Sequence, residues 1–383
     1  MRRKICFVTT VSSTVKSFVL PTIRYLREHT DWEICVMCSD DPELPALLPE
    51  GVRFLPVKME RGISLGGIAA CYKMYQIFRQ EKFDLVQYST PNASLYASLA
   101  AKLARIPVRL YCQWGMAFVG FSGMKRKLFR SIEKLVCSLS TRVCPDSFGN
   151  LHFCHREGLY GPEKSGVVWN GSASGVDLTK FDMEKKPLWR EDMRRKLGIQ
   201  DGETVFVFIG RITGDKGINE LFAAFRSLLE TKPDCRLLLV GREERADSVA
   251  QELYDWAGSE SRVVFCGYTN VVEQYLAASD VYVLPSYREG FGSAVIEAEA
   301  MGVSVIVTDI PGPTDAMEKD VTGLVVPMKD AAALQAAMET LAADPVLRAR
   351  MGAAGHTFAA ERFDQRLLME KILEDRKKLL GQF

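Results

Sequence analysis

Short apolar runs that end in polar, Gly or Pro loops recur along the whole chain, and helical patterns separate them. This alternation is typical of parallel α/β architecture, in which buried strands are followed by helices that cover the sheet. The runs form two series, KICFVTT, WEICVMC, VRFLPV, DLVQYST, VRLYCQ and TRVCPDS, then TVFVFIG, CRLLLVG, RVVFCG, VYVLPS, VSVIVTD and GLVVP. We therefore predict an α/β chain with two Rossmann-like domains that face a cleft.

The 383 residues exceed what one hydrophobic core normally supports, so a division into domains is expected. Residues 182–203 are charged, contain Pro187, Gly198 and Gly202, and separate the two series of runs. We predict an N-terminal Rossmann-like domain over 1–181, a linker over 182–203 and a C-terminal Rossmann-like domain over 204–363. The last helix, over 364–383, precedes no strand, so it either caps the second domain or crosses back to the first.

Charge and cysteine usage exclude several classes of protein. The 49 basic and 48 acidic side chains give a net charge of +1, which argues against a dedicated nucleic-acid binder. Cys35 and Cys38 form a C-x2-C pair, but no second pair completes four zinc ligands. Thr and Ser interrupt the apolar stretch at the N-terminus, and no run reaches the ~18 apolar residues that span a bilayer. We expect a cytoplasmic protein without a metal site.

The segment PSYREGFGSAVIEAEAMG carries the most informative pattern. It follows an apolar run and leads into a helix that we expect Ser293 to cap. Gly290 and Gly292 flank Phe291 and leave backbone N–H groups uncovered before that helix, an arrangement that suits ligand hydroxyls or phosphates. Glu289 stands in the loop and Glu297 in the helix. The alternative is a pair of solvated acids, but the end of a parallel strand is where such folds bind ligands.

Two cations lie in the corresponding place after the first strand of the second series, in GRITGDKG. The strand ends at Gly210, and Arg211 and Lys216 follow in the turn, where they suit a diphosphate. The glycine pattern is not that of a P-loop. KICFVTTVSSTV also lacks G-x-G-x-x-G, so the chain does not resemble a dinucleotide-dependent dehydrogenase.

GRITGDKG, SDVYVLPS, the E-x7-E element EGFGSAVIE and the turn IPGPTDAM together resemble the retaining glycosyltransferases of GT-B family 4. The resemblance is strongest over 204–330 and looser in the N-terminal half, where it includes NGSASGVDL. It implies that Arg211 and Lys216 neutralise the diphosphate of a nucleotide sugar and that Glu289 and the 290–292 backbone hold the sugar hydroxyls. It also places the ribose at Glu297 and the nucleobase near Gly267, Tyr268 and Thr269. The resemblance thus makes 204–363 the nucleotide-sugar-binding domain and 1–181 the acceptor-binding domain.

The same resemblance implies a UDP-sugar donor, with GDP left open, and retention of anomeric configuration without a divalent metal or other cofactor. No D-x-D triplet that would hold a metal–diphosphate occurs in the sequence. Trp114, in VRLYCQWGMAF, stands where many members have the His of a His-Gly pair. Its ring either stacks on a sugar or packs in the domain. Ser12, Ser13 and Lys16, in the loop after the first strand, are predicted to bind the acceptor; a solvated loop is the alternative.

A basic amphipathic helix is predicted from Ser122, with Met124, Leu128, Ile132 and Leu135 recurring on one face. Its charges and the aromatic residues before it are the candidate membrane-facing residues: Phe118, Phe121, Lys125, Arg126, Lys127 and Arg130. Such a segment can lie on an anionic leaflet, although a core helix with a solvated basic face would look the same. On a membrane, the protein would be peripheral on the inner face and its acceptor a saccharide linked to polyprenyl diphosphate.

We therefore expect transfer of a hexose or N-acetylhexosamine from a nucleotide sugar to a glycan or lipid-linked saccharide in cell-surface polysaccharide synthesis. Two alternatives remain open at this point. One is a UDP-N-acetylhexosamine 2-epimerase-like enzyme, which would need no acceptor. The other is a non-catalytic nucleotide-sugar-binding protein.

Overall fold

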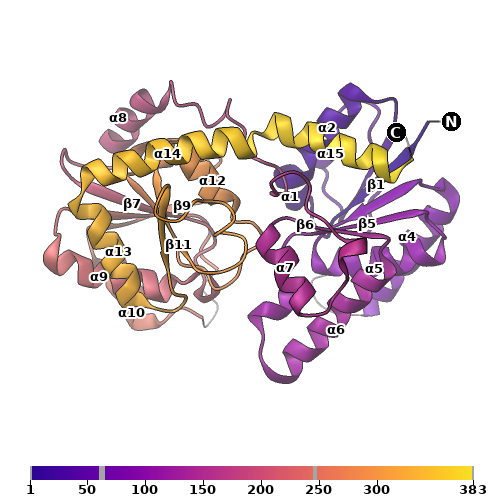
Figure 1. Cartoon of the computed structure of the whole chain (residues 1–383), viewed down its shortest axis with the longest axis horizontal. Coiled ribbons are helices and arrows are strands. Elements are labelled where there is room, and N and C mark those ends of the chain that lie inside the picture. The colour runs from indigo at the N-terminus through magenta and orange to yellow at the C-terminus, as the bar shows by residue number, and fades with distance from the viewer. Residues whose placement is uncertain (1, 60–64, 245–247, 382–383) are drawn as a thin grey trace. The chain divides into compact units, whose positions relative to one another are not determined.

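The computed structural model describes residues 2–59, 65–244 and 248–381 (Figure 1). The chain forms two compact units. The first comprises Met1–Ser174 together with Gln365–Phe383, and the second comprises Gly175–Asp364. Each unit holds one six-stranded sheet, and its strands are paired in parallel. The prediction of an α/β chain with two Rossmann-like domains is confirmed.

The first unit contains the six strands of the first series. They are β1 (Lys4–Val8), β2 (Glu33–Met37), β3 (Arg53–Phe54), β4 (Leu85–Tyr88), β5 (Val108–Gln113) and β6 (Arg142–Pro145). Its longer helices are α2 (Leu20–His29), α4 (Leu65–Glu81), α5 (Pro91–Leu103), α6 (Gly123–Leu139), α7 (Phe148–Arg156) and α15 (Gln365–Leu379). The strand order is β3-β2-β1-β4-β5-β6. β4 is buried along its whole length, as expected for a strand covered by helices on both faces.

The second unit repeats this arrangement. Its strands are β7 (Thr204–Ile209), β8 (Cys235–Val240), β9 (Val263–Gly267), β10 (Val281–Leu284), β11 (Ser304–Thr308) and β12 (Gly323–Val326). Its longer helices are α8 (Lys186–Lys196), α9 (Ile218–Thr231), α10 (Gln251–Ser259), α11 (Val272–Ala278), α12 (Ser293–Ala300), α13 (Ala331–Ala343) and α14 (Pro345–Phe363). The strand order is β12-β11-β10-β7-β8-β9. When the strands are numbered from the start of each unit and this order is reversed, it becomes 3-2-1-4-5-6, the same as in the first sheet.

In both sheets the strand order reverses beside the first strand of the unit. The reversal falls between β1 and β4 in the first unit and between β7 and β10 in the second. The loops that leave two such strands run to opposite faces of the sheet and open a crevice at its carboxyl edge. Each sheet therefore has one place where its topology favours a binding site.

The boundaries of the units differ from the predicted ranges. Residues 182–203, predicted as a linker, contain α8, whose Arg190 guanidinium lies 2.8 Å from the Asp280 carboxylate of the second unit. The segment is ordered against that unit because its basic residues bind the acid and the carbonyls at the end of α11. The last helix, α15, belongs to the first unit, where its Arg376 is buried.

Candidate functional site

The loops after β7 and β10 meet at the crevice of the second sheet. The β7 loop ends at Gly217, the residue before α9, which has φ 72° in the left-handed region. A Cβ at this position would lie 2.0 Å from the carbonyl oxygen of Pro285, the residue that follows β10 by one. Only glycine allows this approach, so it holds the two loops against each other.

Lys216 and Glu289 join the two loops at this point. The Lys216 ammonium lies 2.5 Å from Glu289 Oε1, and the two side chains are only 17% and 14% exposed. Lys216 was predicted to neutralise the donor diphosphate and Glu289 to hold the sugar hydroxyls, and the structure brings the two side chains into direct contact. The ion pair places a cation and an acid, each in the segment that follows a strand, at the edge where an anionic substrate with hydroxyl groups would be held.

Asp215 fixes the turn that presents Lys216. Its carboxylate accepts hydrogen bonds from the Thr213 hydroxyl, at 2.5 Å, and from Arg288 Nη2, at 2.9 Å. Its carbonyl accepts a bond from the backbone N–H of Tyr287. Burial opposes ionisation of Asp215, but the Thr213 bond and the Arg288 charge outweigh it and lower the pKa. The carboxylate is thus held as an anion that positions the loop.

Backbone groups shape the start of α12. Gly292, with φ 86°, precedes the first helical residue and acts as the N-cap, so the prediction that Ser293 caps this helix is wrong. A Cβ at Gly312 would lie 1.9 Å from the carbonyl oxygen of Gly290, so the β11 loop presses on this segment. The Phe291 ring is 3% exposed and packs edge-on against Phe363, 5.1 Å away. Phe291 therefore offers a ligand its backbone rather than its side chain.

Glu297, on α12, has an unusual acid–base environment. Burial raises its pKa to about 7; the Lys180 ammonium opposes the rise and the Glu273 carboxylate adds to it. Lys180 Nζ lies 3.6 Å from Glu273 Oε2, and the Glu273 side chain is only 10% exposed. These partners were not identified from the sequence. Lys180 stands in the predicted N-terminal domain, and Glu273 occupies a helix with no motif, so only the fold brings them together.

Two hydroxyl groups beneath the loops lack partners among the described residues. Tyr282 Oη, in β10, and Ser286 Oγ, just after it, are both fully buried and make no hydrogen bond. The charges of Glu289 and Glu297 both act on Tyr282, so this hydroxyl lies within their field. Buried polar groups are normally satisfied, and unused capacity at this edge indicates a place for a ligand or water.

The residues predicted to contact the nucleobase follow β9. Gly267 ends the strand, Tyr268 is exposed with the Arg242 guanidinium 4.7 Å from its ring centre, and Thr269 accepts a hydrogen bond from the N–H of Val271. Because β9 stands three strands from β10, it lies about 14 Å away along the sheet edge. This distance accommodates an extended ligand that has a base at one end and a sugar at the other.

Arg211 differs from Lys216, although both follow β7. Its guanidinium pairs with Glu244 at 3.2 Å, and the side chains are 48% and 42% exposed. Exposed pairs of this kind are weak, so the side chain can turn toward an anion at little cost. Gly210 begins this loop and was also predicted to contact the donor. It lies against the β8 loop, since a Cβ at Gly241 would fall 1.8 Å from the carbonyl oxygen of Gly210.

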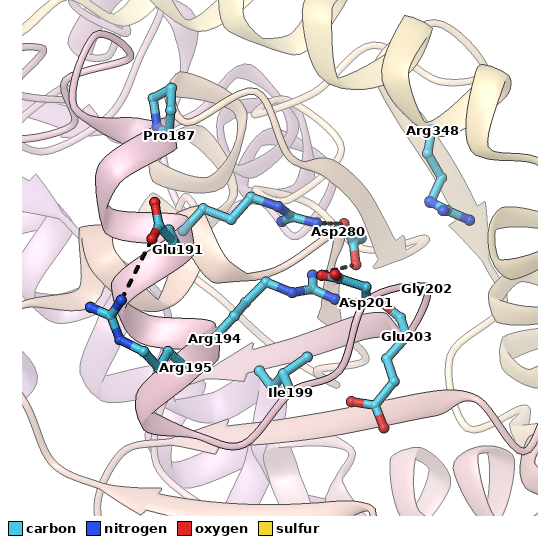
Figure 2. Close-up of a pocket in the computed structure, with 11 residues that line it drawn as sticks. Pro187, Glu191, Arg194, Arg195, Ile199, Asp201, Gly202, Glu203, Asp280 and Arg348 are labelled. Atoms are coloured by element: carbon cyan, nitrogen blue, oxygen red, sulfur yellow. Dashed lines mark hydrogen bonds and ion pairs between the residues drawn. The ribbon is translucent and has the colours of Figure 1, made fainter.

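The opposite, amino edge of the same sheet carries a hollow of about 630 Å³ (Figure 2). Asp280 accepts hydrogen bonds there from Arg190 and from the backbone N–H of Val205, each at 2.8 Å, and Arg194 lies at 3.5 Å. Arg194 also donates to the carbonyl oxygens of Ala278, Gln200 and Glu203. Arg190 and Arg194 thus already bind acceptors of the protein itself. We therefore interpret this hollow as a feature that stabilises the fold and not as a ligand site.

The predicted acceptor residues lie at the carboxyl edge of the first sheet. Ser12 and Lys16 face Asp41, whose pKa is lowered to about 2 by hydrogen bonds from the Ser12 hydroxyl and the Lys16 ammonium. Ser13 is exposed. Trp114 is half-buried, packs against the core of the unit and has the Phe18 ring 5.8 Å away. The structure thus groups Ser12 with Lys16 and shows a packing role for Trp114.

The predicted membrane-facing residues lie on or just before α6. Phe118 is 1% exposed and belongs to the core, so the prediction that it faces outward is wrong; its ring packs with Phe153. Arg126 and Arg130 both bind Glu157, each at 2.8 Å. Lys125 and Lys127 are exposed, and Lys125 lies over the half-buried ring of Phe121.

The described residues contain neither a cluster of metal-binding side chains nor a membrane-spanning helix. Within residues 2–59, 65–244 and 248–381, no three His, Cys, Asp or Glu side chains are grouped as a metal site would require. None of the helices in these ranges is long and apolar enough to span a bilayer.

Comparison with protein families matches both units. The family model described as glycosyl transferases group 1 matches residues 190–358, and the model described as glycosyl transferase 4-like matches residues 4–147. The chain is a glycosyltransferase whose two units match these two family models. The match to the group 1 model covers the segments that carry Lys216, Glu289 and Glu297, so the site described above lies within the matched residues.

Several similar proteins align with most of this glycosyltransferase. The capsular polysaccharide biosynthesis glycosyltransferase CapM of Staphylococcus aureus is 28% identical over 97% of this chain and 96% of its own. An Escherichia coli UDP-Gal:alpha-D-GlcNAc-diphosphoundecaprenol alpha-1,3-galactosyltransferase is 26% identical over 84% of this chain and 83% of its own. The crystal structure of Anabaena HepE in complex with UDP has the same GT-B fold, with TM-score 0.78 and 21% identity over 98% and 100% of the two chains.

Proposed function

We propose that this glycosyltransferase moves a hexose or N-acetylhexosamine from a UDP-sugar to a glycan acceptor linked to polyprenyl diphosphate, in cell-surface polysaccharide synthesis. The observation that carries the proposal is the partly buried Lys216–Glu289 pair at the crevice of the second sheet, beside the glycine-capped start of α12. The activity of the Escherichia coli relative supports the donor and acceptor classes, and the role of the Staphylococcus aureus relative in capsular polysaccharide biosynthesis supports the process.

In the proposed complex the donor diphosphate takes the place of Glu289 beside the Lys216 ammonium. Arg211 turns from Glu244 toward the same phosphates, and the freed Glu289 accepts hydrogen bonds from the sugar hydroxyls. Glu297 accepts a bond from the ribose, and the base lies against Gly267, Tyr268 and Thr269, at the far end of the sheet edge. Positive charge aimed at the leaving diphosphate stabilises the transition state of its departure. Because Lys216 and Arg211 supply that charge, the proposal requires no divalent metal.

Transfer is proposed to proceed with retention. The acceptor hydroxyl attacks the anomeric carbon on the face that the diphosphate leaves; the C–O bond to phosphate breaks as the new glycosidic bond forms. The hydroxyl proton passes to a phosphate oxygen, and UDP departs. The step needs no protein nucleophile. Lys16 and Ser12 are proposed to bind the acceptor, with Ser13 and Trp114 at the border of that region.

Thermal stability with UDP, GDP, ADP and their sugars, with and without EDTA, tests the donor site, because a ligand that binds the native state raises its melting temperature. A UDP-selective rise that survives EDTA and disappears in Lys216→Met supports the proposal. Incubation with the stabilising UDP-sugar and a polyprenyl-diphosphate saccharide then tests transfer, and NMR of the product gives its anomeric configuration. Epimerised UDP-sugar without acceptor would identify an epimerase. Binding without turnover would identify a non-catalytic protein.

We also propose that α6 contacts an anionic membrane surface. Met124, Leu128 and Leu135 are 82%, 54% and 42% exposed, and their spacing places them along one side of the helix. Exposed Lys125 and Lys127 flank them, which suits a segment that lies in the interface of an acidic leaflet. Sedimentation with vesicles containing phosphatidylglycerol should fall when Met124 and Leu128 are both changed to Ser. The matched control, Leu188→Ser, removes an equally exposed leucine from α8 and should leave binding unchanged.

A further inference from the structure

A small cavity of about 20 Å³ lies at the carboxyl edge of the first sheet, and its lining includes Trp114, which is proposed to stand at the border of the acceptor region. Strands β4, β5 and β6 supply one wall, and α15 supplies another. The polar side chains that line it include Gln87, Cys112, Cys144, Asp146 and Arg376. The space holds about one water molecule.

Cys112 and Cys144 stand side by side in the lining of this cavity. They are register partners in the parallel strands β5 and β6. Neighbouring strands stand about 4.8 Å apart, which lies within the Cα separations of about 4.4–6.8 Å that disulfides span. Cys112 is buried and Cys144 is partly exposed, so Cys144 is the thiol that a small reagent can reach.

The surroundings of the pair favour one thiolate. Arg376 is buried, and its Nη2 donates to Gln87 Oε1 at 3.0 Å and lies 3.7 Å from Cys112 Sγ. A hydrogen bond from Cys112 and the Arg376 charge lower the pKa of Cys144, although burial and the Asp375 carboxylate on Arg376 oppose them. The thiolate is the nucleophilic form of cysteine, and partly exposed cysteines beside a cation are the reactive ones.

We propose that Cys144 and Cys112 form a hydroperoxide-reactive thiol pair that closes to a disulfide across β5 and β6. The Cys144 thiolate attacks a peroxide oxygen; the S–O bond forms, the O–O bond breaks, and sulfur gives two electrons to the peroxide, which leaves as water or an alcohol after taking a proton. Cys112 sulfur then attacks the sulfenic sulfur. The S–S bond forms, the S–O bond breaks, and the departing hydroxide takes the Cys112 proton and leaves as water.

The bond would tie together the strand ends that lead to Trp114 and Asp146, both of which line the same cavity. It would therefore restrict the loops at the acceptor side of the first unit. Oxidation of the two cysteines does not depend on the proposed function, because it is measured on the thiols and not through sugar transfer.

The chain contains its own control. Cys6 and Cys35 are also register partners, in β1 and β2, and both are buried. Burial raises the pKa of each, and the Arg53 guanidinium near Cys35 is held by Glu81 at 3.0 and 2.6 Å. This pair shares the strand geometry but lacks a thiolate, so it should react slowly.

The full-length protein is treated with hydrogen peroxide, its remaining thiols are alkylated, and non-reduced peptides are mapped by mass spectrometry. We expect a Cys112–Cys144 cross-link that dithiothreitol reverses, formed at least ~10-fold faster than one between Cys6 and Cys35. In Cys112→Ser, Cys144 should accumulate as sulfenic acid and form an adduct with dimedone. In Cys144→Ser, both products should be absent.

A folded chain that yields no Cys112–Cys144 cross-link, or forms the Cys6–Cys35 cross-link equally fast, would overturn the proposal. The role of Arg376 is tested separately with Arg376→Met and Arg376→Lys, each checked by circular dichroism. Methionine should slow oxidation of Cys144 by about 10-fold and lysine should restore much of the rate. Equal rates in the wild type and in a folded methionine variant would remove Arg376 from the mechanism.

Discussion

The two edges of the second sheet differ in how their polar groups are used. At the amino edge, Asp280 binds Arg190, Arg194 and the N–H of Val205, and the cations donate to further carbonyls. At the carboxyl edge, the hydroxyls of Tyr282 and Ser286 have no partner among the described residues, and an ion pair joins two loops that glycines hold together. Satisfied groups stabilise the fold, whereas unused capacity at a crevice remains for a ligand. Substitutions at the two edges should therefore separate activity from stability.

The largest effect is expected for Lys216→Met at the carboxyl edge. Loss of the cation that faces the diphosphate should lower kcat/KM by roughly 10²–10³, as removal of one electrostatic contact to a transition state does. The free energy of unfolding should change little, because Glu289 remains on a loop. Steady-state kinetics with the UDP-sugar and a urea titration measure the two quantities. Lys232→Met, at the end of α9, is the control and should behave as the wild type. A large loss of stability in Lys216→Met would erase the contrast between the edges.

Asp280→Asn tests the amino edge. It leaves two partly buried guanidinium groups without their carboxylate, which should lower the free energy of unfolding by about 3 kcal/mol. Turnover by the folded fraction should stay within about twofold of the wild type, since the residue lies at the opposite edge from the crevice. Asp201→Asn, in the same hollow but without an ion pair among the described residues, should change stability by less than ~0.5 kcal/mol. Lost donor affinity in folded Asp280→Asn would contradict this separation.

Glu297→Gln, at the carboxyl edge, is expected to change how the stability of the protein depends on pH. The pKa of Glu297 is about 7 in the folded chain, above its ordinary value of 4.5. The folded state therefore binds the proton more tightly, so the contribution of Glu297 to stability falls as pH rises from 4.5 to about 7 and then levels off. Glutamine should remove this decline and stabilise the protein at pH 8 by about 3 kcal/mol. Thermal unfolding at pH 5 and pH 8 measures it.

The same residue should give a signal in binding. If ionised Glu297 accepts a bond from the ribose, donor affinity should rise as pH passes through 7 in the wild type and stay level in Glu297→Gln. Glu299→Gln is the control on the same helix. Burial also raises the pKa of that carboxyl, so glutamine should stabilise the fold at neutral pH without changing donor affinity. Equal pH profiles for the wild type and Glu297→Gln would exclude the contact with ribose.

The smallest effect is expected for Arg211→Ala. Its guanidinium is half-exposed and already paired with Glu244, so we expect donor KM to rise about 10-fold with no change in stability. Arg226→Ala is a matched control, since that side chain is equally exposed and pairs with Glu252 on the same unit. A loss in Arg211→Ala as large as in Lys216→Met would show that both cations bind the diphosphate directly.

The sequence predicted the strands and the site loops well because both depend on local patterns. Apolar runs marked the twelve strands found among the described residues, and the spacing of Gly290, Gly292 and Glu297 marked the start and face of α12. The contact between Lys216 and Glu289 could be expected only in outline, since it depends on which strands are neighbours. The structure shows that β7 and β10, the strands before these two residues, are neighbours at the point where the strand order reverses.

Other features depended on packing that no local pattern reveals. Phe118 looked like an exposed anchor beside a basic helix, but the ring enters the core against Phe153. α14 was not predicted, although Asp344 followed by Pro345 is a helix-start signal, and the Asp344 carboxylate accepts a bond from the N–H of Leu347. The Lys180–Glu273 pair joins residues ninety-three positions apart, and only folding brings the two side chains together.

The return of α15 to the first unit has a consequence for how the chain is made. A ribosome releases the six strands of the first sheet before any of the second, yet the buried Arg376 and the carbonyl of Leu380, which accepts a bond from Arg3, are synthesised only after the second unit. Domains generally fold as units during synthesis. The unit that begins first is thus completed last, and the nascent chain carries an unfinished first unit while all of the second is translated.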